Sequence, residues 1–169
     1  MATQKGFSEL CLSFLRDIYY AERQILKALP KMAKAAESEQ LKQALMQHRE
    51  ETEHQVERLQ QVFEKLGTRA RGQTCEAING IIEEGEEIIG EFEHGPVLDA
   101  GIIANAQAVE HYEMARYGTM VAWAKAAGQT EVVKLLEETL AEEKKADTLL
   151  NQLANKDINQ KASAAKQAA

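Results

Sequence analysis

The most constraining feature of this chain is a set of acidic residues placed where a helical protein normally has leucine. They fall inside the apolar stripe of a predicted helix, near its middle: Glu22, Glu51, Glu110, Glu113, Glu143 and Asp147. A buried carboxylate without a partner is costly and tends to take up a proton. Several carboxylates in one core also repel one another unless a cation lies among them. The pattern therefore predicts a metal site inside a helical bundle.

Apolar residues recur at three- and four-residue steps along most of the chain, as they do on the buried face of a helix. The commonest residue types are also good helix formers. Ser38 can cap the second helix, Gly67 can end it, and Pro96 suits the first turn of the third long helix. The helices are predicted at residues 7–37, 38–67, 75–93, 95–128 and 130–155.

The segment at residues 75–93 distinguishes between two bundle topologies. It is rich in isoleucine but contains three glycines, so we interpret it as a crossover helix rather than a main member of the bundle. With this segment in place, the helix at 95–128 begins at the same end of the bundle as the helix at 38–67. The sequence therefore predicts an all-α, ferritin-like four-helix bundle with a crossover helix between helices 2 and 3.

Length and composition set the outer limits. Residues 1–155 are predicted to form one domain, and residues 156–169, rich in Ala, Lys, Gln and Ser, a frayed or disordered tail. The net charge of −7, without a basic stripe, argues against nucleic acid as a partner. No apolar run reaches the roughly 18–20 residues that cross a membrane, and the N-terminus lacks the apolar core of a signal peptide. We therefore expect a cytoplasmic protein.

The second long helix carries polar residues at positions that the periodicity assigns to the core, namely His48, Glu51, Thr52 and Gln55. His48 projects near the centre of the apolar stripe and His54 to its margin, so periodicity favours His48 as the inward imidazole. The Glu51-x-x-His54 step, however, matches the Glu-x-x-His motif of di-iron bundles, which favours His54. Both histidines are therefore candidate ligands.

The third and fourth long helices each contribute two further acids. Glu110 and Glu113 lie one turn apart, and Glu143 and Asp147 lie between apolar positions of the last helix. In a second Glu-x-x-His motif the histidine would fall at Ala146, so this ligand is missing. Asp147 or Glu113 could fill that coordination position.

One shared site is predicted because Glu22 and Glu51 lie on successive antiparallel helices, as do Glu110 and Glu143. Each pair can therefore lie at the same height in the bundle. An oxygen-rich ligand set with one or two imidazoles suits Fe(II), Mn(II) or a mixed pair better than structural zinc. We therefore predict two iron ions, with manganese as the alternative, and two of the glutamates could bridge them. The candidate ligands are Glu22, His48, Glu51, His54, Glu110, Glu113, Glu143 and Asp147.

Four sequence strings carry a resemblance to a known family. They are YAERQ around Glu22, HREETEHQVERL around Glu51, VEHYEMARYG around Glu110 and EEKKAD around Glu143. Over about residues 8–155 the chain resembles the bacterial YciF/YciE-type ferritin-like stress proteins. The resemblance implies a ferritin-like bundle that is often dimeric, is linked to stress responses, and has a di-iron centre but no firmly attached activity. The positions that match the family are Glu22, Glu51, Glu110, Glu113 and Glu143 as its acids, and His48 and Asp147 as flanking polar residues.

These observations leave two main hypotheses for the function, and they do not decide whether the protein is an enzyme. The first is a dinuclear metal protein that handles iron or peroxide in a stress response, with O₂ or peroxide as the oxidant. The second is a homodimeric structural or interaction bundle whose metal site is stabilising or vestigial and does not turn over. Ala146 argues against ferroxidase chemistry of the usual kind. A storage cage ranks lowest, because the polar tail does not resemble a cage-forming fifth helix.

Overall fold

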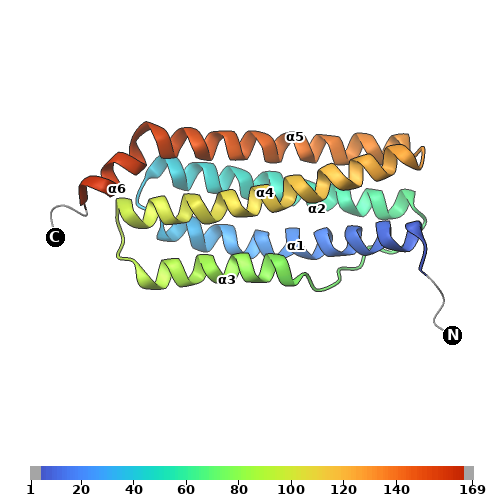
Figure 1. Ribbon diagram of the computed structural model, residues 1–169, viewed down its shortest axis with the longest axis horizontal. Helices are drawn as coiled ribbons and strands as arrows, with labels where there is room; N and C mark the ends of the chain where they lie inside the picture. Colours follow the sequence, from blue (N-terminus) through green and yellow to red (C-terminus); the bar gives the residue numbers. More distant parts are fainter. Residues whose placement is uncertain (1–4, 166–169) are drawn as a thin grey trace.

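The computed structural model describes residues 5–165, and over that range it consists of helices and connecting turns without any strand (Figure 1). The five main helices are α1 (Phe7–Ala35), α2 (Glu39–Lys65), α3 (Glu76–Glu91), α4 (Pro96–Ala126) and α5 (Thr130–Leu153). A short π-helix (Ala154–Ile158) and α6 (Asn159–Ala165) follow. The all-α, ferritin-like four-helix bundle predicted from the sequence is confirmed.

The four long helices form two antiparallel pairs, α1 with α2 and α4 with α5 (Figure 1). Helix α3 packs against α1 and α4 and runs back along the bundle, so α2 and α4 begin at the same end (Figure 1). This arrangement brings α2 alongside α5 as well. The middle sections of α1, α2, α4 and α5 therefore surround one common core.

Local signals set the helix ends close to their expected places. Ser38 caps α2 by accepting a hydrogen bond from the Leu41 amide, and the buried Asp99 accepts from the amides of Glu37 and Ser38 at 2.7 and 2.8 Å. Glycine with positive φ follows α2 and α4, at Gly67 and Gly128. Since Asp99 lies on α4, its two bonds tie the α1–α2 turn to the second pair of helices.

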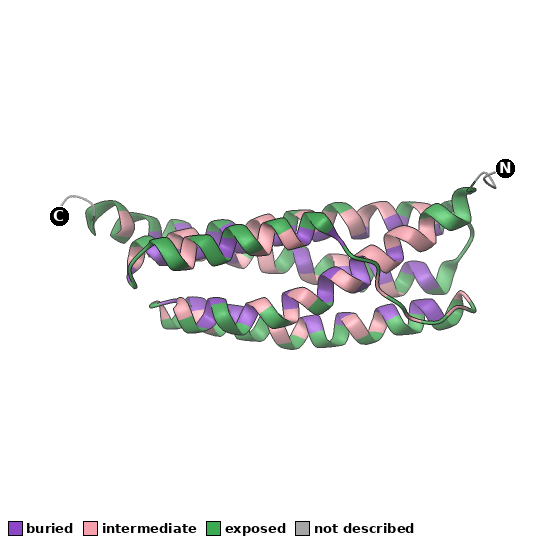
Figure 2. Cartoon of the chain, turned by 90° about the horizontal axis from the view of Figure 1, so that it is seen from below, coloured by how far each residue is buried: buried purple, intermediate pink, exposed green. Residues whose placement is uncertain are grey.

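The inner faces of the helices carry the buried residues, and the outer faces are exposed (Figure 2). The core is aliphatic over most of its length, with the fully buried Phe63 and Tyr117 as its largest side chains. No helix among the described residues is long and apolar enough to cross a bilayer.

The C-terminal segment differs from the prediction. We expected a frayed or disordered tail from Lys156, but the chain remains helical through Ala165. The burial of Ile158 explains this helical end. Its side chain is buried, and the segment around it packs against α4. Residues 166–169 lie outside the described part of the chain.

Candidate metal centre

Three helices bring four ligand-type side chains together in the middle of the bundle. His48 from α2, Glu110 and Glu113 from α4, and Glu143 from α5 each offer an atom within 4.8 Å of the others. All four side chains are buried, Glu113 and Glu143 completely. In the middle of the bundle, these polar side chains occupy core positions that are aliphatic elsewhere along the helices.

The His48 ring lies between carboxylates from three directions. Its Nε2 is 3.1 Å from Glu110 Oε1 and 3.8 Å from Glu143 Oε2, and its Nδ1 is 3.7 Å from Glu51 Oε2. Neither ring nitrogen makes a hydrogen bond of acceptable geometry within the described residues. The ring therefore lies close to three carboxylates without a hydrogen bond to any of them.

Glu22 adds a carboxylate from α1. It is fully buried and accepts a hydrogen bond from the Tyr117 hydroxyl, which lies two turns after Glu110 on α4. The charges of Glu143 and Glu22 both act on Glu113, which places Glu22 beside the four-residue cluster rather than at another height of the bundle. All four long helices thus contribute to the site.

Burial and mutual repulsion both oppose ionisation of these acids. Burial first, and then the neighbouring charge of Glu143, raises the pKa of Glu22, Glu110 and Glu113 well above the ordinary glutamate value. Most of the carboxylate oxygens also lack any hydrogen-bond partner among the described residues. The unpartnered oxygens are Glu22 Oε2, Glu110 Oε2, and both oxygens of Glu113 and of Glu143.

This donor set fits a metal ion. Buried polar atoms without hydrogen-bond partners are rare in folded proteins and call for an explanation. A cation among them would satisfy the free lone pairs and remove the repulsion between the acids. Oxygen donors with one imidazole are typical ligands of iron and manganese.

Glu51 stands at the edge of the cluster. Its side chain is 24% exposed, and it accepts a hydrogen bond from Gln47 at 3.1 Å. The nearby His48 ring lowers the pKa of Glu51, in contrast to the buried acids. Periodicity assigned Glu51 to the core, but the structure leaves it partly exposed, since Thr52 takes the fully buried position next to it.

Two of the predicted ligands lie apart from the cluster. His54 is 68% exposed and approaches Glu57 on its own helix, so of the two histidines only His48 points inward. Asp147 is half-buried, accepts a hydrogen bond from Gln107 and lies 3.2 Å from the exposed His111 ring. The structure therefore follows the periodicity, which favoured His48, and not the Glu-x-x-His motif.

A clamp between α2 and α5 does not follow from the sequence pattern. Arg58 donates to both carboxylate oxygens of Glu142 at 2.6 and 2.7 Å and to Glu138 at 2.9 Å. Gln55 donates to the same Glu142. No local sequence pattern marks Glu142 as a paired side chain, because its partners Gln55 and Arg58 lie on another helix, 87 and 84 residues away along the chain. The clamp fixes α5 next to the Glu143 position.

The fold and the cluster together define a class, namely a ferritin-like four-helix bundle with a buried carboxylate and histidine cluster. Comparison with known proteins supports this class. The chain is 43% identical over 159 residues to Protein YciF of Escherichia coli (strain K12), covering 94% of this chain and 96% of that protein. Residues 7–163 match the family described as a domain of unknown function (DUF892), and the chain belongs to this family.

Solved structures give the same result. The E. coli stress protein YciF superposes with a TM-score of 0.89 at 43% identity, over 94% of this chain and 100% of that chain. YcfI from Rhodopseudomonas palustris, whose description suggests a structural protein, superposes with a TM-score of 0.86 at 53% identity, over 89% and 96%. The resemblance to the YciF family seen in the sequence is therefore confirmed.

Proposed function

We propose that the buried cluster binds two transition-metal ions, iron in the first place and manganese as the alternative. The charge of the site supports this number. Four fully or almost fully buried carboxylates, from Glu22, Glu110, Glu113 and Glu143, carry four negative charges when ionised, and two divalent cations balance them. With one divalent cation, two of the four acids would have to be neutralised by protons instead.

The distances suggest how the ligands divide. His48, Glu110, Glu113 and Glu143 can reach a common ion, because their ligand atoms lie within 4.8 Å of one another. Glu22 on α1 and Glu51 at the edge flank this group and would complete a second position. The proposal leaves out His54 and Asp147, whose side chains pair elsewhere.

The function that we propose for this site is the handling of iron or peroxide in a stress response. Two ferrous ions held by these residues would be a source of two electrons, enough to reduce dioxygen with two protons to hydrogen peroxide, or hydrogen peroxide with two protons to two water molecules. The description of the E. coli relative as a stress protein supports this setting. The protein's own residues hold the ions, keep bulk water out of the core and, through Tyr117, orient Glu22.

The second candidate is a structural bundle whose metal stabilises the fold without turnover. The description of the R. palustris relative favours it. The missing second histidine, at Ala146, also favours it, since the ligand set departs from that of the di-iron motif.

In either case we place the protein in the cytoplasm as a homodimer. Its free thiols Cys11 and Cys75 suit a reducing compartment, and the exposed apolar side chains of Phe7 and Leu10, one turn apart at the start of α1, suit an interface.

Oxidant consumption separates the two candidates. Protein loaded with Fe(II) under anaerobic conditions is mixed with O₂ or with hydrogen peroxide, and oxidant loss and the absorbance of Fe(III) are followed together. The proposal expects repeated consumption when Fe(II) is resupplied, and the same behaviour for the exposed control Glu137→Gln. Metal binding with a higher Tm but no oxidant consumption would select the structural role instead.

A further inference from the structure

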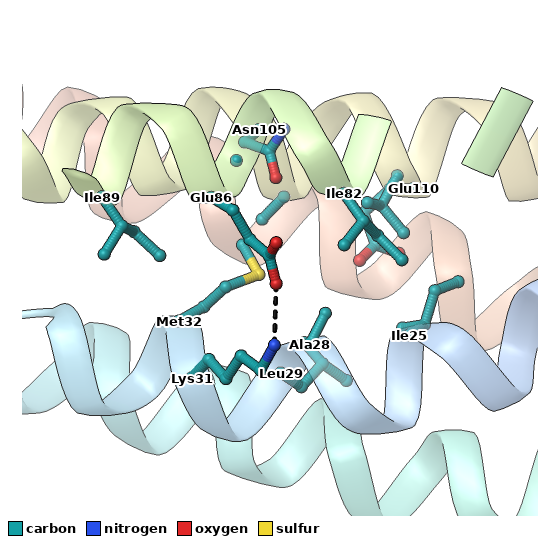
Figure 3. Close-up of a pocket in the computed structure, with 13 residues that line it drawn as sticks. Ile25, Ala28, Leu29, Lys31, Met32, Ile82, Glu86, Ile89, Asn105 and Glu110 are labelled. Carbon is teal, nitrogen blue, oxygen red and sulfur yellow. Dashed lines mark hydrogen bonds and ion pairs between the residues drawn. The ribbon is translucent and has the colours of Figure 1, made fainter. Parts of the chain in front are cut away.

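A small cavity lies beside the cluster, between α1, α3 and α4 (Figure 3). Its volume is about 20 Å³, which is room for one molecule of the size of water or dioxygen. Its inner wall includes Glu110, the same residue that approaches His48. The cavity therefore reaches the candidate metal centre from the side that α3 covers.

The lining of this cavity is almost entirely apolar. Its larger apolar side chains are those of Ile25, Leu29, Met32, Ile82, Ile89 and Val109. The one buried amide in the wall, Asn105, donates one hydrogen bond to the Ile81 carbonyl at 2.8 Å, which ties its side chain to the backbone of α3. Apart from Glu110 at the inner end, a guest inside the cavity would find few hydrogen-bond partners.

An ion pair lies on the outer side of the cavity. Lys31 on α1 and Glu86 on α3 are 2.7 Å apart and bridge the two helices (Figure 3). Both side chains are more than half exposed, so the pair is a surface contact that contributes little stability and opens readily. The cavity wall between this pair and Glu110 is mostly apolar, and Ala28 contributes a single methyl group to it.

We propose that this cavity admits and holds dioxygen on its way to the metal centre. The inference rests on the proposed function for the reaction at the centre, and it names the oxidant. A diatomic apolar gas loses nothing on entering an apolar cavity, whereas hydrogen peroxide and metal cations would lose their hydrogen bonds to water. The structure thus favours dioxygen over peroxide as the molecule that uses this route.

A second cavity, on the opposite side of Glu110, differs from the first in having a more polar lining. It lies between α2 and α5, has a volume of about 30 Å³, and includes the polar side chains of Gln47, Glu51 and Lys145. Ala146 occupies a half-buried place in its wall, as Ala28 does in the apolar cavity. Leucine at either position replaces a methyl group by an isobutyl group, so the two variants form a matched pair.

Xenon tests the cavity without any metal, because it is an apolar probe that enters dry apolar cavities and needs no hydrogen bond there. Crystals of the metal-free full chain under xenon pressure should show xenon between α1, α3 and α4. The site should be lost in Ala28→Leu and kept in Ala146→Leu. Absence of xenon from the wild-type cavity overturns the proposal, and this result needs no variant to fold.

Kinetics on iron-loaded protein then test the route. Oxidation of bound Fe(II) by dioxygen should slow about tenfold or more in Ala28→Leu and remain near the wild-type rate in Ala146→Leu. Oxidation by hydrogen peroxide should be unchanged in Ala28→Leu. Equal dioxygen rates in wild type and in an Ala28→Leu variant that excludes xenon overturn the proposal. Failure of iron to bind the wild type is seen separately by metal analysis and would overturn the proposed function instead.

Discussion

Tyr117 donates its hydroxyl hydrogen to Glu22, and both side chains are fully buried. The bond joins α4 to α1 directly beside the carboxylate cluster. Burial, together with the charge of Glu22, raises the pKa of Tyr117, so the phenol keeps its proton and remains a donor. The other oxygen of Glu22 has no hydrogen-bond partner within the described chain, which leaves it available as a metal ligand.

Removal of this hydroxyl should destabilise the protein. Tyr117→Phe leaves a buried carboxylate oxygen without its donor, so we expect a loss of about 1–3 kcal/mol in the free energy of unfolding. Tyr20→Phe is the matched control, because its half-buried hydroxyl donates to Asn79 at 3.1 Å and water can replace it. Urea titrations of both variants give the comparison. Equal losses of unfolding free energy in the two variants would show that the Tyr117–Glu22 hydrogen bond stabilises the fold no more than the Tyr20–Asn79 bond does.

The metal-free protein should become more stable when one buried acid is made neutral. The folded state raises the pKa of Glu113 above its ordinary value of 4.5, so the folded chain binds more protons than the unfolded chain as pH rises past that value. The contribution of Glu113 to stability is therefore present below pH 4.5 and is lost progressively above it. Glu113→Gln should exceed the wild type in stability at pH 7, and the difference should shrink as pH falls towards 4.5. A difference that is constant with pH would count against ionisation as its cause.

The two histidines should differ in metal affinity. His48 is buried among the acids, whereas His54 is 68% exposed, so we expect His48→Ala to weaken Fe(II) or Mn(II) binding by about tenfold or more. His54→Ala should change the affinity by less than about twofold, in line with surface substitutions elsewhere. Calorimetric titration under anaerobic conditions measures both. The reverse order of effects would restore the Glu-x-x-His interpretation.

Metal should also stabilise the fold by mass action. At a free metal concentration of 100 times Kd, the gain is about 2.7 kcal/mol for each ion bound, which for a chain of this length raises Tm by about 5–10 °C per ion. Glu143→Gln should lose most of this shift, because Glu143 contributes to the cluster from α5. Glu137→Gln on the same helix, with an exposed side chain, should retain it. A chelator should reverse the shift in the wild type.

Much of the fold follows from the sequence because helical periodicity and capping are local signals. Ser38, Gly67 and Pro96 mark helix ends that the structure places within a few residues of the expected positions. The helical end of the chain does not follow from the sequence pattern, because it depends on one buried side chain, Ile158, and a single large apolar residue gives no period to detect.

The candidate site was only partly visible for a different reason. Periodicity gives the direction of a side chain to within one position on the helix, which was enough for Glu22, His48 and Glu113. It could not resolve Glu51, since Glu51 and Thr52 compete for one inward place. Pairs between helices that are distant in sequence, such as Arg58 with Glu142, depend on the helix register, which the sequence pattern does not contain.

Metal content tests the central claim most directly. Protein purified after growth with added iron, or reconstituted with Fe(II) or Mn(II), should contain about two metal ions per chain by elemental analysis. The double variant Glu113→Gln, Glu143→Gln should contain well below one ion per chain, while the exposed pair Glu84→Gln, Glu137→Gln should equal the wild type. Equal metal in all three proteins, or none in the wild type, would contradict the assignment of the buried cluster as a metal centre.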